Sequence, residues 1–257
     1  MEVLLLNRKV IKKLKGAIFL LLLSVIASLL INSKGVFLSQ SNKVPIYSVK
    51  TEEKKVAITF DVNWGQSNTK KILDILDKNN VKATFFLIGN WIDDFPEETK
   101  EIYKRGHEIG NHSNTHPDMR KVSKGKIINE ISITDAKIMK IIGKNTKLFR
   151  CPSGSYNDSV IDVVNSTGHY CVQWDVDSID WKAEGADKEY NRVISKTKPG
   201  SIILFHNDGK YTPQTLPIII RELKHKGYQF VTVGDLIYKE NYYINNEGKQ
   251  IKKMGKQ

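Results

Sequence analysis

The feature that most constrains the fold is a regular alternation of short apolar runs and amphipathic segments across residues 55–236. The apolar runs are rich in β-branched and aromatic residues, as strands are. They cover residues 55–61, 81–89, 107–113, 146–152, 169–177, 201–207 and 228–233. The segments between them follow a helical period, and in one of them Ile72, Leu73 and Leu76 share a helical face. Because no hairpin turn signal joins consecutive runs, we expect parallel strands covered by helices.

This pattern predicts an α/β fold. A Gly-rich phosphate loop follows none of the predicted strands, which disfavours a dinucleotide-binding sheet. We therefore expect a distorted (β/α) barrel of about seven parallel strands. The predicted domain covers residues 54–238, residues 32–53 are a predicted linker, and residues 239–257 are a predicted basic polar tail.

The formal net charge of +12 lies mainly at the two ends of the chain. Residues 1–50 carry +7 and residues 239–257 carry +3, whereas residues 51–238 carry only +2. A nucleic-acid-binding protein concentrates its positive charge on the folded domain, so we expect no nucleic-acid partner. Basic ends of this kind suit a membrane surface or an anionic wall polymer.

Residues 1–31 have the pattern of an export signal. A basic stretch at residues 8–16 precedes the 15 uncharged residues 17–31. This length falls short of the roughly 20 residues that cross a bilayer, and no A-x-A cleavage site follows. A cleaved signal peptide and an uncleaved signal-anchor both stay open. We expect an exported protein, either membrane-anchored on the extracytoplasmic side or secreted to the cell wall or spore.

Polar or ionisable side chains stand at the ends of five predicted strands. In β/α barrels the reactive residues collect at the carboxyl ends of the strands. The residues at these ends are Asp61, Asn111 with His112, Arg150, Asp175 with Asp177, and His206. Their number predicts an active site on this face of the barrel.

Two of these strand ends carry recognisable chemistry. His112 and His116 are four residues apart, which we expect to bring both imidazoles to one side of a helical turn, as two ligands of one divalent cation. A hydrolytic metal site needs two or three protein ligands and an open position for water. Arg150 precedes a turn containing Gly154; the guanidinium can lower the pKa of a carboxylate, and a backbone N–H of the turn can stabilise an oxyanion.

Three acids, Asp175, Asp177 and Asp180, also admit a glycosidase with paired carboxylates. Aspartate is common in loops after strands, so this signal is weak. Trp181 beside them can stack on a sugar ring or simply pack. His206 follows four apolar residues, at the mouth of a buried strand, where an imidazole can serve as general acid.

Taken in order, these segments resemble the motifs of the polysaccharide deacetylases, the NodB-homology domain of carbohydrate esterase family four. The matching segments are TFD at 59–61, HSNTH at 112–116, RCPSGSY at 150–156, DSIDW at 177–181 and LFH at 204–206. The resemblance covers about residues 54–236, and the subgroup looks like the sporulation-associated, secreted or single-pass deacetylases. It implies a distorted (β/α) barrel that hydrolyses the N-acetyl group of amino sugars in a cell-wall or spore glycan and releases acetate.

The resemblance also implies a role for each matched residue. Asp61 would be the general base, held and tuned by Arg150. His206 would be the general acid that protonates the leaving amine, with Asp180 tuning the acid–base groups. The residues implied in substrate binding are Tyr156, through its backbone N–H, and Trp181 and Leu204, which would line the space for the acetyl methyl group.

The chain departs from the family pattern at the metal. His112 and His116 would be ligands, but the aspartate that usually completes the triad is replaced by Val62, which cannot ligate. Asn63 offers an uncharged carbonyl oxygen, and a bulge or turn after Asp61 would bring it to the cation. We expect a divalent metal of the Zn²⁺ or Co²⁺ type on His112 and His116, with Asn63 or water completing the site. The alternative is a catalytically weak or inactive glycan-binding member of the family.

Overall fold

The structure is a computed structural model that describes residues 15, 18–21, 24 and 43–253. The chain divides into two compact units, residues 1–41 and residues 42–257. Within the predicted export segment, residues 15, 18–21 and 24 are helical and exposed; the rest of that segment, and the predicted linker up to residue 42, lie outside the described residues. The described residues contain no helix that is both long and apolar enough to cross a membrane.

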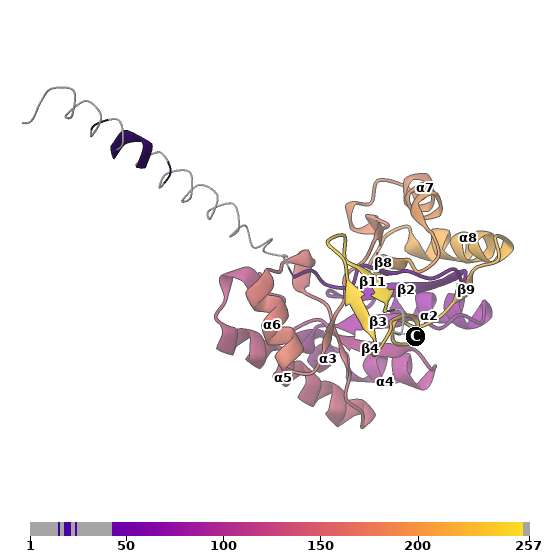
Figure 1. The fold of residues 1–257 in the computed structure, drawn as a ribbon. Helices are drawn as coiled ribbons and strands as arrows, with labels where there is room; N and C mark the ends of the chain where they lie inside the picture. Colours follow the sequence, from indigo (N-terminus) through magenta and orange to yellow (C-terminus); the bar gives the residue numbers. More distant parts are fainter. Residues whose placement is uncertain (1–14, 16–17, 22–23, 25–42, 254–257) are drawn as a thin grey trace, which may run out of the picture. The chain divides into compact units, whose positions relative to one another are not determined.

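Residues 43–253 are built around one curved parallel sheet, in which neighbouring strands follow the order β6–β5–β4–β3–β2–β8–β7 (Figure 1). The strands are β2 (Lys55–Val62), β3 (Thr84–Leu87), β4 (Glu108–Asn111), β5 (Leu148–Phe149), β6 (Tyr170–Cys171), β7 (Val176–Asp177) and β8 (Ile202–His206). The short β9 (Gln229–Phe230) pairs with the beginning of β2. The predicted distorted (β/α) barrel of about seven parallel strands is confirmed.

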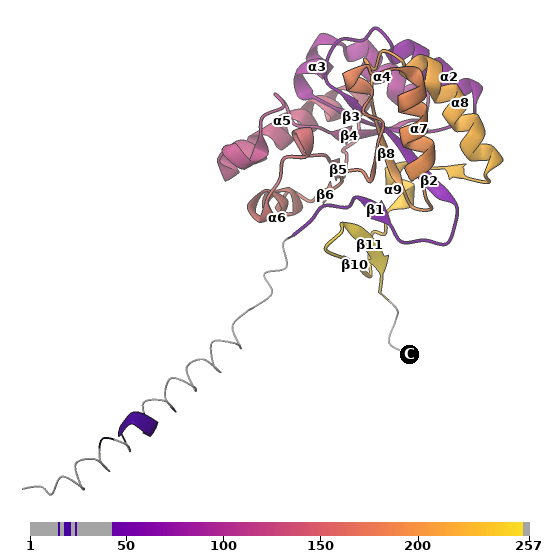
Figure 2. The same cartoon turned by 90° about the horizontal axis from the view of Figure 1, so that it is seen from above.

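The helices lie around the outside of this curved sheet (Figures 1 and 2). They are α2 (Thr69–Lys78), α3 (Gly89–Asp94), α4 (Pro96–Lys104), α5 (Lys124–Ile142), α6 (Asp158–Ser166), α7 (Ala186–Lys196), α8 (Thr212–His225) and α9 (Val233–Leu236). The longest, α5, begins at the N-cap Ser123, whose side chain accepts from the Lys126 N–H, and ends at Gly143. Gly143 has φ 70°, which closes the helix at little steric cost.

The central strand β2 presents alternate side chains to its two faces. Phe60 and Val62 belong to the apolar cluster that the sheet forms with the surrounding helices. Thr59 and Asp61 point to the opposite face, where both contact the side chain of Arg150. The alternation of side chains along the strand therefore places Asp61 on the inner face of the sheet and Val62 on the outer face, against the helices.

The predicted single strand at residues 169–177 is wrong, since it consists of the two strands β6 and β7 at opposite edges of the sheet. Residues 172–175 cross the open side between them. Ile46 fills part of this opening: its N–H donates to the Cys171 carbonyl at 2.9 Å, and its carbonyl accepts from the Gln173 N–H at 2.7 Å. Pairing with residues from before the barrel thus covers exposed backbone groups of an edge strand.

A second, small sheet forms from residues on either side of the barrel, within the segments that were predicted as a linker and a basic polar tail. β1 (Ser48–Val49) pairs in parallel with β11 (Lys249–Lys252), and β11 pairs in antiparallel with β10 (Tyr242–Ile244). The hairpin between β10 and β11 closes where the Gly248 N–H donates to the Asn245 carbonyl. Gly248 has φ 75°, a conformation that glycine adopts without strain.

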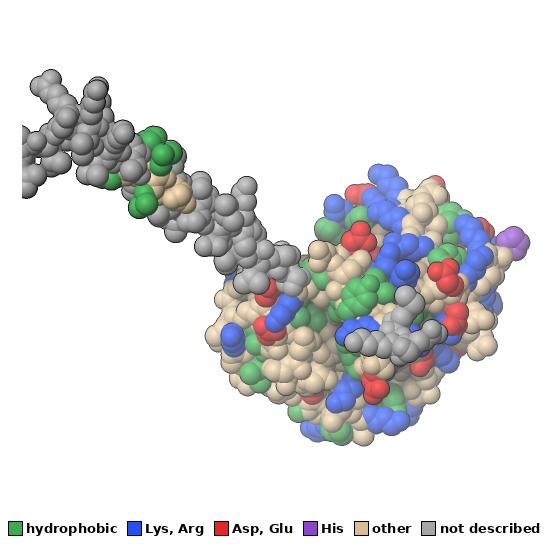
Figure 3. All heavy atoms as spheres, in the orientation of Figure 1, with side chains coloured by type: hydrophobic (Ala, Val, Ile, Leu, Met, Phe, Trp, Pro, Cys, Tyr) green, Lys and Arg blue, Asp and Glu red, His purple; other side chains and the backbone are tan. Residues whose placement is uncertain are grey.

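The surface of the folded unit carries both signs of charge. On the face shown in Figure 3, Lys and Arg side chains are interspersed with Asp and Glu. This distribution agrees with the small net charge of residues 51–238.

Candidate active site

Asp61 is the penultimate residue of β2, and only 3% of it is exposed. Arg150, which follows β5, is fully buried and donates from Nη1 to Asp61 Oδ1 at 2.7 Å and to Thr59 Oγ1 at 2.9 Å. Its Nη2 donates to the Gln173 carbonyl at 3.1 Å. Burial alone would raise the pKa of Asp61, but the guanidinium and two nearby imidazoles outweigh it and hold that pKa below its usual value. Asp61 is therefore a carboxylate at neutral pH.

His206 ends β8 in register with Asp61 on the adjoining β2. Its ring Nδ1 lies 2.7 Å from Asp180 Oδ1, and its backbone N–H donates to Asp180 Oδ2 at 2.7 Å. Thr212 Oγ1 also donates to Asp180 Oδ2, at 3.1 Å. Burial alone would lower the pKa of His206, but the Asp180 carboxylate raises it to about 9. His206 is therefore an imidazolium at neutral pH, with Nε2–H turned away from its carboxylate partner.

His112 and His116 lie in a loop after β4, so the predicted helical turn is wrong. Ser113 has φ 70° and His116 has φ 57°, and these two left-handed residues reverse the chain sharply enough to place the ring centroids 5.0 Å apart. The His112 Nδ1 lies 2.8 Å from the Arg150 carbonyl, to which it donates, leaving Nε2 without a proton. Burial lowers the pKa of both imidazoles, that of His112 to about 4.

The loop is held by Glu130 of α5, a residue that the sequence analysis did not single out. Its Oε2 accepts from the backbone N–H groups of Asn114 and Thr115 at 2.8 and 2.7 Å, and its Oε1 accepts from Thr115 Oγ1 at 2.9 Å. Asn111 Oδ1 accepts from the Ser113 N–H at 2.8 Å on the other side of the turn. The loop geometry is therefore set from α5 as well as from β4.

The donor atoms around this loop fit a divalent cation with neutral ligands. His112 Nε2 and Asn63 Oδ1 are both buried without a hydrogen-bond partner, a costly state that a cation would relieve. His112 Nε2 is 3.4 Å from Asp61 Oδ2. The described residues contain no group of three or more His, Cys, Asp or Glu side chains that could hold a metal ion. Among the described residues, the neutral donors at this place are the imidazoles of His112 and His116 and the amide oxygen of Asn63, which lines the same cavity as His116.

These groups open into a cavity of about 510 Å³ at the carboxyl ends of the strands. The lining residues include Asp61, Asn63, His116, Trp181, Leu204 and His206. Trp181 is 61% exposed at the rim, whereas Leu204 is buried. Tyr156 is not among the lining residues; Ser153, three residues before it, lines the cavity, and the Tyr156 hydroxyl pairs with that of Tyr47 at 3.0 Å. Asp177 also lines it, whereas Asp175 accepts from the backbone N–H of Ile202 away from the cavity.

Comparison with known proteins identifies the family. Residues 48–172 match the family model described as polysaccharide deacetylase. The chain is 41% identical to the uncharacterized protein YlxY of Bacillus subtilis over 75% of this chain and 60% of YlxY, so it spans less than two thirds of that relative. It is 33% identical to the peptidoglycan-N-acetylmuramic acid deacetylase PdaA of Bacillus subtilis, over 76% of this chain and 75% of PdaA.

A solved structure of BA3943, a CE4 family pseudoenzyme from Bacillus anthracis, superposes with a TM-score of 0.73 at 36% identity, covering 75% of this chain and 68% of that one. A BA3943 mutant with restored enzymatic activity superposes equally well, at TM-score 0.73. An inactive protein and its reactivated mutant thus share this fold. The chain belongs to the polysaccharide deacetylase family, the carbohydrate esterases of family four.

Proposed function

We propose that this protein hydrolyses the N-acetyl group of amino sugars in a cell-wall or spore glycan and releases acetate, using a divalent cation of the Zn²⁺ or Co²⁺ type. One observation carries the proposal: Asp61 and His206 line the same cavity, and each is paired with a residue of opposite charge, Asp61 with Arg150 and His206 with Asp180. Asp61 is deprotonated and His206 protonated at the same neutral pH. Amide hydrolysis needs such a base and acid together.

The two pairs divide the proton transfers between them. Arg150 engages Asp61 Oδ1, which leaves Oδ2 to accept the proton of the water that attacks the acetyl carbonyl. The C–N bond then breaks, and His206 Nε2 delivers its proton to the leaving amine nitrogen. Asp180 keeps the imidazole oriented and stabilises its charged form before the transfer.

His112 and His116 would hold the cation through ring nitrogens and Asn63 through its amide oxygen. When bound, such a cation polarises a carbonyl and lowers the pKa of a water molecule. The pKa of about 4 for His112 keeps its Nε2 free of protons at neutral pH, so that protons compete little for this ligand.

The substrate class follows from the relatives and from the walls of the cavity. PdaA is a peptidoglycan deacetylase, and an exported protein with the predicted signal at residues 1–31 would meet the same polymer. Leu204 offers an apolar surface to the acetyl methyl group, and the exposed Trp181 offers a ring face to a sugar. We assign the backbone N–H of Tyr156 to the oxyanion from the motif match alone.

A second candidate function is glycan binding with little or no catalysis. It is favoured by the neutral donor set, which lacks the usual carboxylate, and by the similarity to a pseudoenzyme. In this case the cavity and the exposed Trp181 would bind the glycan and the acid–base pairs would be retained without turnover.

The test is acetate release by the full chain in detergent from N-acetylglucosamine oligomers and from peptidoglycan, with Zn²⁺, Co²⁺ or a chelator. We expect release that depends on the metal and is lost in Asp61→Asn and His112→Ala. Asp187→Asn and His225→Ala, which change exposed residues of the same types, should leave it unchanged. Saturable glycan binding without acetate at any metal concentration would refute the enzyme, and new reducing ends would indicate a glycosidase.

A further inference from the structure

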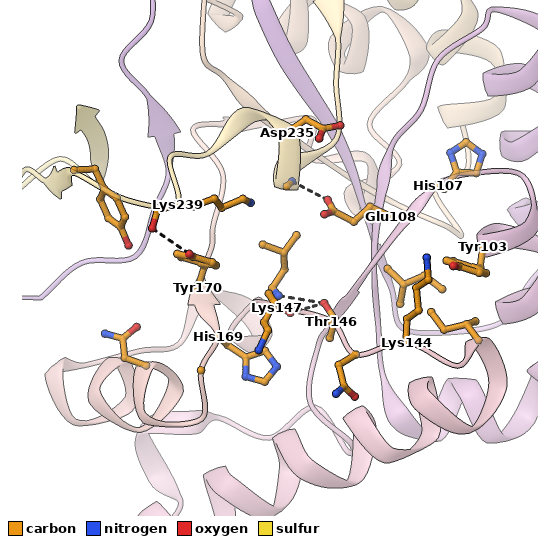
Figure 4. Close-up of a pocket in the computed structure, with 18 residues that line it drawn as sticks. Tyr103, His107, Glu108, Lys144, Thr146, Lys147, His169, Tyr170, Asp235 and Lys239 are labelled. Carbon is orange, nitrogen blue, oxygen red and sulfur yellow. Dashed lines mark hydrogen bonds between the residues drawn. The ribbon is translucent and has the colours of Figure 1, made fainter. Parts of the chain in front are cut away.

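A second and larger cavity, of about 870 Å³, opens at the opposite end of the strands (Figure 4). Glu108, Leu148 and Tyr170 line it, and each is the first residue of its strand, in β4, β5 and β6. The acid–base groups of the candidate active site lie at the carboxyl ends of the same sheet. The two cavities are therefore separate sites.

Three lysines surround this second cavity: Lys144 and Lys147 in the loop between α5 and β5, and Lys239 after α9. Within the part of the chain that the structure describes, the lysine ion pairs all involve other lysines. Figure 4 shows Lys144 at one end and Lys239 at the other, with Lys147 between them. Three ammonium groups without carboxylate partners around one hollow attract an anion.

Two carboxylates, Glu108 and Asp235, also line the cavity, and neither forms an ion pair with the three lysines among the described residues. Glu108 Oε2 accepts from Thr84 Oγ1 at 2.7 Å and from the Gly234 N–H at 2.9 Å, so this oxygen joins β3, β4 and α9. Burial raises the pKa of Glu108, which disfavours its charge. Asp235 is exposed at the edge. Lys239 is turned toward Glu108 in Figure 4; burial lowers the pKa of Lys239, and the nearby charges of Glu108 and Asp235 oppose this effect.

Aromatic rings and one buried donor complete the lining. The Lys144 ammonium lies 5.6 Å from the centre of the Tyr103 ring, and that of Lys239 lies 5.4 Å from the centre of the Tyr170 ring. His107 accepts at Nδ1 from the Ala83 N–H, so its proton is on Nε2, which is buried without a partner. A ring face beside a positive charge suits a sugar that bears an acidic group, and an unpartnered donor suits one of its oxygens.

We propose that this second cavity binds an anionic saccharide segment, whose carboxylate or phosphate groups contact the three lysines while its sugar rings pack on the tyrosines. The evidence for an anion site is the three lysines and His107. The further statement that the saccharide belongs to a wall polymer rests on the proposed function. The site would hold the chain on the polymer while the active-site cavity at the other end of the strands remains accessible.

The test is equilibrium binding of the full chain in detergent to three probes. The first is peptide-free glycan strands that carry lactyl carboxylates, the second a glycerol-phosphate oligomer, and the third a neutral N-acetylglucosamine oligomer. We expect at least one anionic probe to bind, more weakly at higher salt. The double variant Lys147→Gln/Lys239→Gln should weaken that binding about tenfold, since each lost contact of an exposed ammonium contributes a few-fold.

The matched control is Lys71→Gln/Lys196→Gln, which removes the same charge from exposed positions on α2 and α7. It should leave the anion affinity unchanged. The proposal is overturned if neither anionic probe binds, or if the two double variants weaken binding equally, which would reflect net charge alone. Because the readout is binding, an absence of acetate release would not affect it.

Discussion

The protonation state of His206 depends on a single carboxylate, and this dependence can be tested directly. Asp180 contacts both the ring Nδ1 and the backbone N–H of His206 at 2.7 Å and is itself almost fully buried. With this partner the pKa of His206 is raised from 6.5 to about 9. Replacing Asp180 by Asn keeps the shape and removes the charge, so burial becomes the dominant influence.

We expect the pKa of His206 in Asp180→Asn to fall below 6.5. The rise of the wild-type pKa from 6.5 to about 9 corresponds to a preference of about 3 kcal/mol for the charged imidazole. A pKa raised by folding stabilises the protein fully below the unfolded value of 6.5, and this contribution is lost as pH rises through 9. The difference in unfolding free energy between wild type and variant should therefore be largest below pH 6.5 and decline above it.

The assay is a pH titration of the histidine ring signals by NMR in metal-free protein, because a cation at His112 and His116 would itself lower the pKa of His206. Asp187→Asn, an exposed acid elsewhere, is the control. If the enzyme is active, the alkaline limb of its rate profile, near pH 9 in wild type, should move down with the same variant. A His206 signal that titrates near pH 9 in both Asp180→Asn and wild type would refute the reasoning.

Three further outcomes are expected. Arg150→Met should lower the unfolding free energy by about 3–5 kcal/mol in urea titrations, because it leaves a buried carboxylate unpaired; a loss below 1 kcal/mol would contradict this. Glu130→Gln should weaken Zn²⁺ binding about tenfold by calorimetry, as loss of a supporting contact does, whereas Lys126→Gln, which removes only the ion pair of Glu130, should not; equal effects would contradict a positioning role. Asn63→Asp should strengthen Zn²⁺ binding, since it puts a negative charge at an unpartnered oxygen. Val62→Asp should instead destabilise the fold, because it buries a charge among apolar side chains. If Val62→Asp strengthened Zn²⁺ binding and Asn63→Asp did not, β2 would have to end before Val62.

The barrel could be predicted because local pattern and tertiary structure agree along most of it. The strand runs at residues 55–61 and 201–207 are continuous apolar segments, as the buried strands of a parallel sheet are. The run at residues 169–177 is also rich in β-branched and aromatic residues but belongs to two edges of the sheet. Nothing local marks that break, because it depends on Ile46, more than 120 residues earlier, pairing with residues 171–173. The small sheet of β1, β10 and β11 escaped prediction for the same reason.

The sequence predicted which residues lie at the strand ends of the candidate site, but not how their side chains are arranged in space. The order of the strands brings Asp61, Arg150 and His206 together, whereas the loop at residues 112–116 depends on left-handed residues that are not glycine. The role of Glu130 could have been predicted from the sequence, because this charged residue interrupts the apolar face that Ile127 and Ile131 form on α5. A charged residue in such a face is buried with partners.

The alternation in β2 bears on whether the protein is an enzyme. Val62 lies on the same face of the strand as Phe60, so a carboxylate at that position could not reach the histidines while β2 remains extended through residue 62. An apolar residue at position 62 is therefore consistent with a strand that stays extended to its end, and in the proposed metal site the third donor would come from Asn63 or from water.

The cost of this arrangement is electrostatic. The negative charge of Asp61 is already offset by Arg150 at 2.7 Å, so little negative charge remains to balance a divalent cation. Near a protein surface, one unit charge at 4 Å contributes about 4 kcal/mol to another; even a fraction of this lowers metal affinity by orders of magnitude. The missing carboxylate weakens metal binding but leaves the Asp61–Arg150 and His206–Asp180 pairs intact. If the protein is a deacetylase, acetate release should rise with metal concentration far above the range that saturates relatives with a carboxylate ligand, and Asn63→Asp should move that range down. A rate that is zero at every metal concentration in both proteins would leave glycan binding as the function.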